Sequence, residues 1–286
     1  MNGNWTRIDI TCGADSADVL ASELAEAFGV SVEYVSDGVR VYLAGERLAE
    51  SRQRLLQIVD DVPRHPGEGP RQISFAEIPD EDWLRKWKEN FHPLPVGTRF
   101  LVSPTWEPAP RDSERLIVRI DPGRAFGTGH HETTRLCLQW LEDSGFSLGT
   151  TPVTLLDVGT GSGILAIGAA LLGFKEITAV DNDPEAVETA KENALLNGLE
   201  HRIQILCQTP SEVEGQFDAV ISNIESGPLI RMAGAIASKV RAGGRLALSG
   251  ILLEQAGLVC AEYEKMGLAP SGRIAAGEWV LLAFTK

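Results

Sequence analysis

The sequence contains little cysteine and no long apolar run. Its 286 residues include four cysteines and no Cys-x-x-Cys pair: Cys12, Cys137, Cys207 and Cys260. This pattern excludes a disulfide framework and a cysteine zinc cluster, and it is typical of reduced thiols in the cytoplasm. No apolar stretch approaches the roughly 20 residues of a membrane helix, and the first residues lack the basic start and apolar core of a secretory signal. We therefore expect a cytoplasmic protein without a membrane partner.

Basic residues are also scarce. The chain has 26 Lys and Arg against 40 Asp and Glu, for a formal net charge of −14. Tight non-specific binding to nucleic acid needs a basic face that displaces counterions from phosphates, so we expect no direct nucleic-acid partner. An acidic protein attracts a basic macromolecular substrate, but the same charge also keeps an ordinary cytosolic protein soluble. Charge alone leaves both interpretations open.

Residues 1–65 have the pattern of a small α+β domain. Alternating and helical periodicities predict a strand, a helix, a hairpin around Asp37-Gly38 and a second helix, with a further strand candidate at 71–78. This order fits a split βαβ, ferredoxin-like layout, which extends to residue 78 if the strand candidate at 71–78 joins it. Because it carries no catalytic cluster, we interpret it as a substrate-recognition domain.

Residues 66–114 are predicted to form a linker with a helix and strands. A Pro- and Gly-rich turn at 63–70 precedes a helix that carries Trp83 and Trp87 four positions apart, a spacing more typical of packing than of function. Strand-like runs follow at 98–106 and 115–122.

From residue 115 to 286 apolar strands alternate with helices. Short apolar runs begin at 153, 176, 202, 217, 244 and 277, and helical patterns occupy 163–173, 184–198, 227–241 and 254–267. Such alternation indicates a parallel sheet covered on both faces, which is a doubly wound α/β domain.

A glycine run follows the first strand of this domain. In "LLDVGTGSGIL" (155–165), Gly159, Gly161 and Gly163 have the spacing G-x-G-x-G. The dinucleotide fingerprint is G-x-G-x-x-G, so a nicotinamide or flavin cofactor is disfavoured, and no Gly-Lys-Ser/Thr follows to make a phosphate loop. The position, between a strand and a helix, is still that of a nucleotide-binding loop.

An acidic residue closes the next strand. Asp181 lies 22 positions after Gly159, where a carboxylate can accept hydrogen bonds from both ribose hydroxyls of a nucleoside. Asp157, just before the glycines, is placed to face a positive amino or sulfonium group. Together these features point to S-adenosylmethionine. The alternative is that Asp181 and Asp183 only cap the helix that begins at Pro184.

Asn223 ends the fourth strand, "FDAVISNI". Its amide can accept from a substrate N–H and donate to the cofactor carboxylate, so we predict that it positions the acceptor amine. Methyl transfer from a sulfonium needs in-line proximity, a path for the proton and a dry site, and it needs no nucleophile triad. The alternative is a polar strand end that caps the next helix.

The stretch "DPGRAFGTGHHETTRLCL" (121–138) is the other candidate ligand loop. Adjacent histidines point in different directions, so His130, His131 and Glu132 make a poor metal site, and we predict no metal. Thr133 and Thr134 offer hydroxyls to a cofactor. The histidines are left as channel lining or as a catalytic base.

The chain resembles the bacterial methyltransferases that modify large-subunit ribosomal protein L11. The matching blocks, in order, include "DWLRKWKENFHPLPVG", "DPGRAFGTGHHETTRLCL", "LLDVGTGSGILAIGAALLG", "VDNDPEAVETAKENALLNG", "FDAVISNI", "GGRLALSGIL" and "GEWVLLAF". The resemblance implies a small N-terminal recognition domain and a Rossmann-like, seven-stranded methyltransferase domain. It implies N-methylation of lysine ε-amines and of the N-terminal α-amine of L11, with cofactor contacts from Thr134, Gly159, Asp181 and Asn223.

The sequence departs from that family in two places. "IESGPL" follows Asn223 where the family has an apolar or small pair, so Glu225 either places a carboxylate near the acceptor lysine or points to solvent. Residues 1–65 match the family only in pattern. Two rival functions therefore stay open beside the favoured one. They are a related enzyme acting on another protein or a small amine, and a catalytically silent S-adenosylmethionine-binding module. We expect a monomer.

Overall fold

The computed structural model describes residues 5–28, 30, 32–35, 37–64, 68–78, 92–107, 113–121, 131–143, 146 and 153–286. The chain divides into two compact units, Met1–Phe91 and His92–Lys286. Each unit is described by itself below. In the described part of the chain, no helix is long and apolar enough to cross a membrane.

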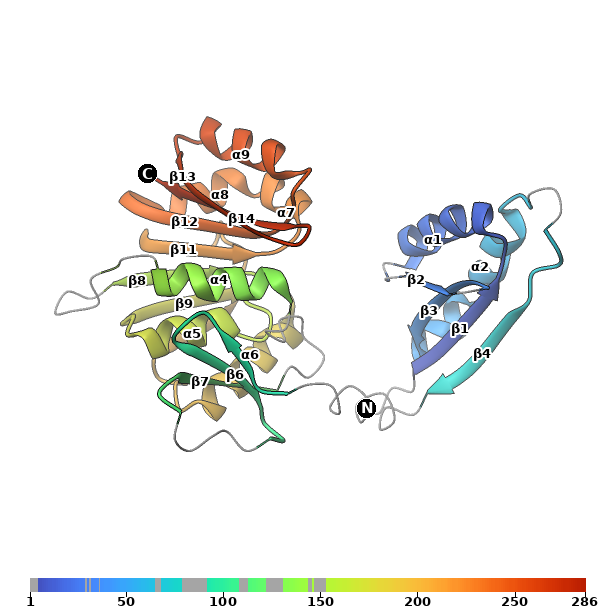
Figure 1. Cartoon of the computed structure of the whole chain (residues 1–286), viewed down its shortest axis with the longest axis horizontal. Helices are drawn as coiled ribbons and strands as arrows, with labels where there is room; N and C mark the ends of the chain where they lie inside the picture. Colours follow the sequence, from blue (N-terminus) through green and yellow to red (C-terminus); the bar gives the residue numbers. More distant parts are fainter. Residues whose placement is uncertain are drawn as a thin grey trace. The chain divides into compact units, whose positions relative to one another are not determined.

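The first unit is an antiparallel sheet with two helices (Figure 1). Its elements are β1 (Trp5–Thr11), α1 (Ala14–Phe28), β2 (Val32–Val35), β3 (Gly38–Ala44), α2 (Gly45–Asp61) and β4 (Ile73–Ile78). The strand order β2-β3-β1-β4 is that of the predicted split βαβ layout. Alternate residues of β1 and β3, such as Ile8 and Val41, pack on Leu24 of α1 and Leu55 of α2 to form the core.

The observed division, between residues 91 and 92, differs from the predicted boundaries, which were at 65 with an extension to 78, and at 115. β4 pairs with β1, with Ile8 opposite Phe75, so the first unit extends past residue 65 because its sheet needs this strand. The predicted linker also contributes strands to the second unit: β5 (Leu94–Val96) and β6 (Phe100–Pro104) form a three-stranded sheet with β7 (Leu116–Ile120). The predicted helix with Trp83 and Trp87 lies outside the described residues.

The second unit contains a seven-stranded sheet with the order β10-β9-β8-β11-β12-β14-β13. Its strands are β8 (Thr154–Val158), β9 (Glu176–Asp181), β10 (Ile203–Cys207), β11 (Phe217–Asn223), β12 (Val240–Leu252), β13 (Ala269–Ala276) and β14 (Trp279–Thr285). The seven-stranded domain is confirmed, and its sheet is mixed at one edge, because β14 runs antiparallel to both β12 and β13. β13 and β14 are joined by a short turn instead of a crossover helix.

Helices cover both faces of this sheet (Figure 1). One layer contains α4 (Glu132–Asp143), α5 (Ile164–Leu172) and α6 (Pro184–Leu196), and the other contains α7 (Ser226–Arg231), α8 (Ala233–Lys239) and α9 (Ala256–Lys265). Neighbouring strand residues alternate between the layers: Leu155 packs with the first and Leu156 with the second. The helix predicted at 227–241 is two helices, divided at Met232.

The strand order places the end of β8 at a reversal point. β9 and β11 flank β8 and run parallel to it, so the carboxyl ends of all three strands lie at one edge of the sheet. The chain proceeds from β8 to β9 on one side and later to β11 on the other. Open α/β sheets bind ligands at such a switch point.

Candidate functional site

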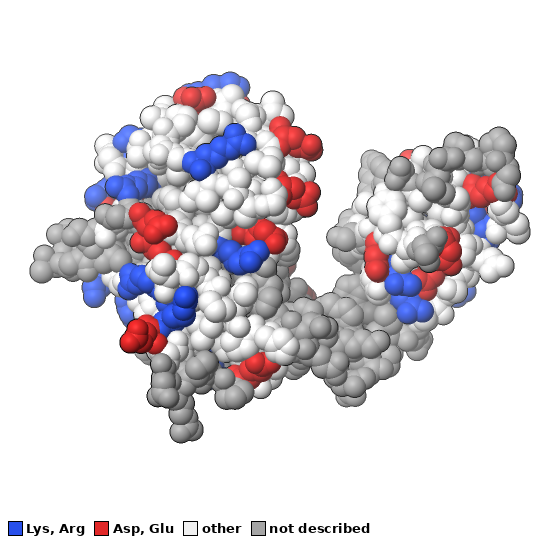
Figure 2. All heavy atoms as spheres, in the orientation of Figure 1, with Lys and Arg blue, Asp and Glu red and all other residues white. Residues whose placement is uncertain are grey.

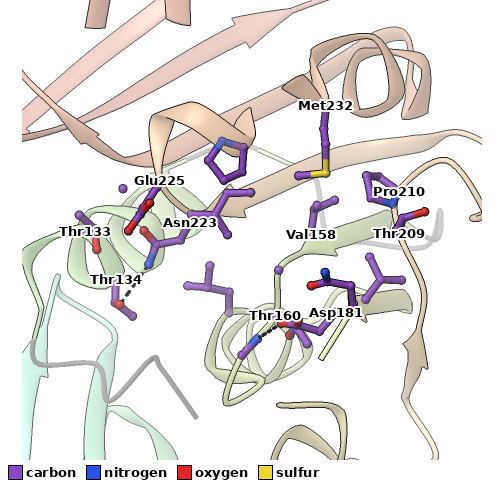
Figure 3. A pocket seen from close by; sticks show the side chains of 18 of the residues that line it. Thr133, Thr134, Val158, Thr160, Asp181, Thr209, Pro210, Asn223, Glu225 and Met232 are labelled. Atoms are coloured by element: carbon purple, nitrogen blue, oxygen red, sulfur yellow. Dashed lines mark hydrogen bonds between the residues drawn. The ribbon is translucent and has the colours of Figure 1, made fainter. Parts of the chain in front are cut away.

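A cavity of about 690 Å³ opens at the carboxyl ends of β8, β9 and β11 (Figure 3). Six of the eight predicted site residues line it: Thr133, Thr134, Gly159, Gly161, Asp181 and Asn223. Strand ends and the first turn of α4 supply these residues, so segments far apart in the sequence meet at one place. The two predicted residues that do not line the cavity are Asp157 and Gly163.

The glycine loop brings backbone to the cavity wall. Gly159 and Gly161 have φ values of 72° and 54°, in the left-handed region that glycine adopts without strain. A Cβ at Gly159 would lie 2.5 Å from Cγ2 of Ile224, so a larger residue would have to displace that side chain. The amides of Gly159 and Thr160 both donate to the carbonyl of Val180, which ties the loop to β9.

Asp181 lies across from this loop and is partly engaged by backbone amides. Gly161 N–H donates to its Oδ2 at 3.0 Å and Asp183 N–H to its Oδ1 at 3.1 Å. A carboxylate has about four acceptor positions, so two remain for ligand hydroxyls. Asp183 is the helix cap, because its side chain accepts from Glu185 N–H at 2.9 Å at the start of α6. The capping alternative therefore holds for Asp183, whereas Asp181 faces the cavity.

Asp157 and Gly163 serve the structure beneath the loop. Asp157 is fully buried, and the Thr160 hydroxyl donates to its Oδ2 at 2.7 Å. Burial raises the pKa of this carboxyl to about 7, against the opposing effect of the Thr160 hydroxyl. Gly163 has a φ of 82°, and a Cβ there would lie 3.2 Å from Cβ of Ala190, so its small size permits α6 to pack against the loop. Their contact with a cofactor stays a prediction.

Asn223 presents a free acceptor at the cavity. Its Nδ2 donates to the Thr134 hydroxyl at 3.2 Å (Figure 3). Its Oδ1 is buried and has no hydrogen-bond partner among the residues that the structure describes. A buried acceptor without a partner costs free energy, so the atom is suited to a ligand N–H or O–H.

Of the 121–138 stretch the structure describes Asp121 and residues 131–138, and His130 and the glycines of this stretch lie outside the described residues. The His131 ring is held between neighbours: Nδ1 lies 2.8 Å from the Thr133 hydroxyl, and the ring packs edge-on against Trp279 with centroids 4.9 Å apart. Within the described residues, no group of three or more His, Cys, Asp or Glu could hold a metal ion.

Few charges line the cavity. Among its described lining residues the acidic and basic side chains, apart from His131, are two carboxyl groups and one guanidinium: Asp181, Glu225 and Arg231. Glu225 is exposed, immediately before α7, and lies at the Thr133 and Asn223 end, away from Asp181 (Figure 3). A site for a phosphorylated ligand collects cations or several amide donors, so this balance does not favour a dinucleotide.

Several lining residues escaped the sequence analysis. Gln208, Thr209 and Pro210 follow β10, which is the neighbour of β9, and the strand-end rule could have found them. Trp279 could not be found in this way, because it begins β14, an antiparallel strand whose first residue lies at the edge where the parallel strands end.

Comparison with known proteins agrees with this geometry. A model of the family "Ribosomal protein L11 methyltransferase (PrmA)" matches residues 4–286. Two curated relatives carry the name ribosomal protein L11 methyltransferase. The one from Geobacter sp. (strain M21) is 38% identical, over 100% of this chain and 99% of its own length, and the one from Edwardsiella ictaluri (strain 93-146) is 36% identical, over 93% and 94%.

A solved structure is also similar. The crystal structure of ribosomal protein L11 methylase from Lactobacillus delbrueckii subsp. bulgaricus superposes with a TM-score of 0.63 at 32% identity, over 68% of this chain and 99% of that one. With a family match over nearly the whole sequence and full-length relatives above 30% identity, the chain belongs to the ribosomal protein L11 methyltransferase family.

Proposed function

We propose that this chain is an S-adenosylmethionine-dependent protein methyltransferase that N-methylates lysine ε-amines and the N-terminal α-amine of ribosomal protein L11. The observation that carries the proposal is the single cavity in which the glycine loop, Asp181 and Asn223 meet at three strand ends. Relatives named for L11 methylation support the choice of substrate.

The residues of one end of the cavity fit a nucleoside. The remaining acceptor positions of Asp181 suit ribose hydroxyls, and the glycine loop lets backbone approach the ligand closely. Among the described lining residues Arg231 is the one Lys or Arg, which suits a ligand without phosphates. When bound, S-adenosylmethionine supplies a methyl group on a sulfonium, which is already activated for transfer.

The other end of the cavity fits an amine. Oδ1 of Asn223 can accept an N–H of the incoming nitrogen and so fix the direction of its lone pair. The Thr134 hydroxyl accepts from Nδ2 of the same amide, which fixes the orientation of the amide group. The exposed carboxylate of Glu225 would attract a lysine as its ammonium ion, which must release a proton to solvent before its nitrogen has a lone pair to donate.

Charge and cysteine content support the remaining parts of the proposal. A net charge of −14 suits a basic protein substrate and opposes binding to nucleic acid. Figure 2 shows acidic and basic side chains interspersed over the described residues of the face in view. All four cysteines are free thiols, which fits action in the reducing cytoplasm. We propose that the enzyme acts there as a monomer.

Mass spectrometry of purified L11 tests the proposal. L11 is incubated with the full chain and S-adenosylmethionine carrying an isotope-labelled methyl group, and the labelled positions are mapped on peptides. A preparation of L11 with an acetylated N-terminus separates α-amine from ε-amine methylation, and lysozyme serves as a basic control protein. We expect label in L11 alone. Equal labelling of lysozyme would favour a broader amine methyltransferase, and no label in either would overturn the proposal.

A further inference from the structure

Asn193 of α6 connects the two sequence motifs that flank the cavity. It is completely buried. Its Nδ2 donates to the carbonyl of Ser162 in the glycine loop at 2.9 Å and to the carbonyl of Asp121 at 3.0 Å, and its Oδ1 accepts from Asp121 N–H at 2.8 Å. Both amide hydrogens are thus used, one on each motif.

Asn197, one helical turn later, makes a similar contact without reaching the loop. Its Oδ1 accepts from Arg119 N–H at 2.9 Å, and its Nδ2 donates to the Arg119 carbonyl at 2.7 Å. The second donor contact of Nδ2 is to the Asn193 carbonyl of its own helix, also at 2.7 Å. Each asparagine therefore pairs with the N–H and the C=O of one residue at or just beyond the end of β7, as a neighbouring strand would. Only Asn193 also bonds the glycine loop.

Ser162, whose carbonyl accepts from Asn193, lies between Gly161 and Gly163, and these two glycines make different contacts. On one side of Ser162, Gly161 lines the cavity and donates to Asp181. On the other side, Gly163 packs against Ala190, which lies three residues before Asn193 on the same helical face. Moving the Ser162 carbonyl would therefore move the amide that contacts Asp181.

The other backbone that Asn193 holds is that of Asp121, directly after the end of β7. Asp121 opens the 121–138 stretch, and further along it His131, Thr133 and Thr134 line the cavity. We propose that Asn193 is a positioning residue that fixes the glycine loop relative to the end of β7, and that the affinity of the site for S-adenosylmethionine depends on it. This inference rests on the proposed function for its ligand.

Two matched variants of the full chain, Asn193→Ala and Asn197→Ala, test the proposal. Each removes backbone hydrogen bonds at the end of β7, so both should lower the thermal midpoint. Only Asn193→Ala should weaken S-adenosylmethionine binding, by about tenfold, which is the loss expected when one well-formed polar contact disappears. Should Asn193→Ala fail to fold, Asn193→Asp keeps the shape and the acceptor for Asp121 N–H but removes both donor contacts, to the carbonyls of Ser162 and Asp121, and the same loss is expected. Wild-type affinity in the Asn193 variant, or an equal loss in Asn197→Ala, would overturn the inference.

Hydrogen exchange without ligand separates this inference from the proposed function. Asn193→Ala should speed amide exchange in residues 159–163, and Asn197→Ala should leave it as in the wild type. Unchanged exchange in the loop of Asn193→Ala would overturn the inference even if cofactor binding is confirmed. Faster exchange in a protein that does not bind S-adenosylmethionine would support the positioning role and count against the proposed function.

Discussion

At the scale of single residues, Asp181 and Asp183 separate a binding role from a capping role. We expect Asp181→Ala to weaken S-adenosylmethionine binding about tenfold or more, because each lost ribose hydrogen bond is worth on the order of 1 kcal/mol. Asp183→Ala is the control: it removes the cap of α6 and should cost about 1 kcal/mol of stability while leaving affinity unchanged. Titration calorimetry measures the affinities. Unchanged affinity in Asp181→Ala would contradict the ribose assignment.

Asn223 is predicted to act on the acceptor amine more than on the cofactor. We expect Asn223→Ala to lower kcat roughly tenfold to a hundredfold, because the variant loses the buried acceptor that orients the nitrogen. The affinity for S-adenosylmethionine should fall much less. Steady-state kinetics with L11, together with calorimetry on the same preparation, measure the two effects. Equal losses in both would assign Asn223 to the cofactor.

The buried carboxyl of Asp157 makes stability depend on pH. Its pKa is about 7 in the folded protein against an ordinary value of 3.8, so between these values the unfolded chain binds fewer protons and stability falls as pH rises. Asp157→Asn removes this contribution. The free energy of unfolding of the variant, relative to the wild type, should therefore rise by about 2 kcal/mol between pH 5.5 and pH 8. Urea denaturation at both pH values measures it, and a constant difference would contradict the pKa shift.

The residues of the candidate site were predictable where a strand end alone places them. Gly159, Asp181 and Asn223 each stand at or next to the last residue of a parallel strand, so strand order was enough. The role of Asp157 was harder to predict, because its place near the end of β8 does not show toward which face of the sheet its side chain points. It shares the strand face of Leu155, which packs under α5, and so it is buried beneath the loop.

At the scale of helices and strands, strong periodicity made most elements predictable. β13 was missed, because this edge strand is exposed along nearly all its length and contains Pro270 and Gly272, so no apolar pattern marks it. The division between α7 and α8 was missed for the opposite reason: the apolar pattern continues through Met232 although the backbone turns there. The antiparallel direction of β14 follows from its pairing with β12 and β13, which the apolar pattern of the strand itself does not show.

The turn after β8 is an element whose shape the ligand requires. We expect Gly159→Ala to weaken S-adenosylmethionine binding about tenfold, because the new Cβ meets Ile224 at 2.5 Å at the cavity wall. Gly198→Ala is the matched control, since Gly198 also has a positive φ, of 65°, but open space around a Cβ. Both variants should lose about 1 kcal/mol of stability from backbone strain. Calorimetry should show the affinity loss in Gly159→Ala alone; an equal loss in both would assign it to strain.

At the scale of the whole molecule, the described lining of the cavity belongs to one of the two units. Every described residue that lines the cavity lies in the second unit, between His131 and Trp279. The first unit contributes a sheet of its own, in which β1 is the central partner of both β3 and β4. A deletion that ends at residue 65 would leave β4 without its partner and expose an unpaired strand edge. Residue 91 is therefore the better place to divide the chain.

We predict that a chain of residues 92–286 binds S-adenosylmethionine like the full chain but no longer methylates L11. All the described residues that line the cavity are present in this unit, whereas the proposed recognition domain is absent. Cooperative thermal unfolding shows whether the shortened chain is folded, calorimetry gives its affinity, and mass spectrometry of L11 gives its activity. A short lysine peptide at high concentration is the control, because it needs no docking surface and should be methylated slowly by both chains. Normal methylation of L11 by residues 92–286 would show that the first unit does not recognise the substrate, and loss of cofactor binding in a folded chain would show that the cavity needs it.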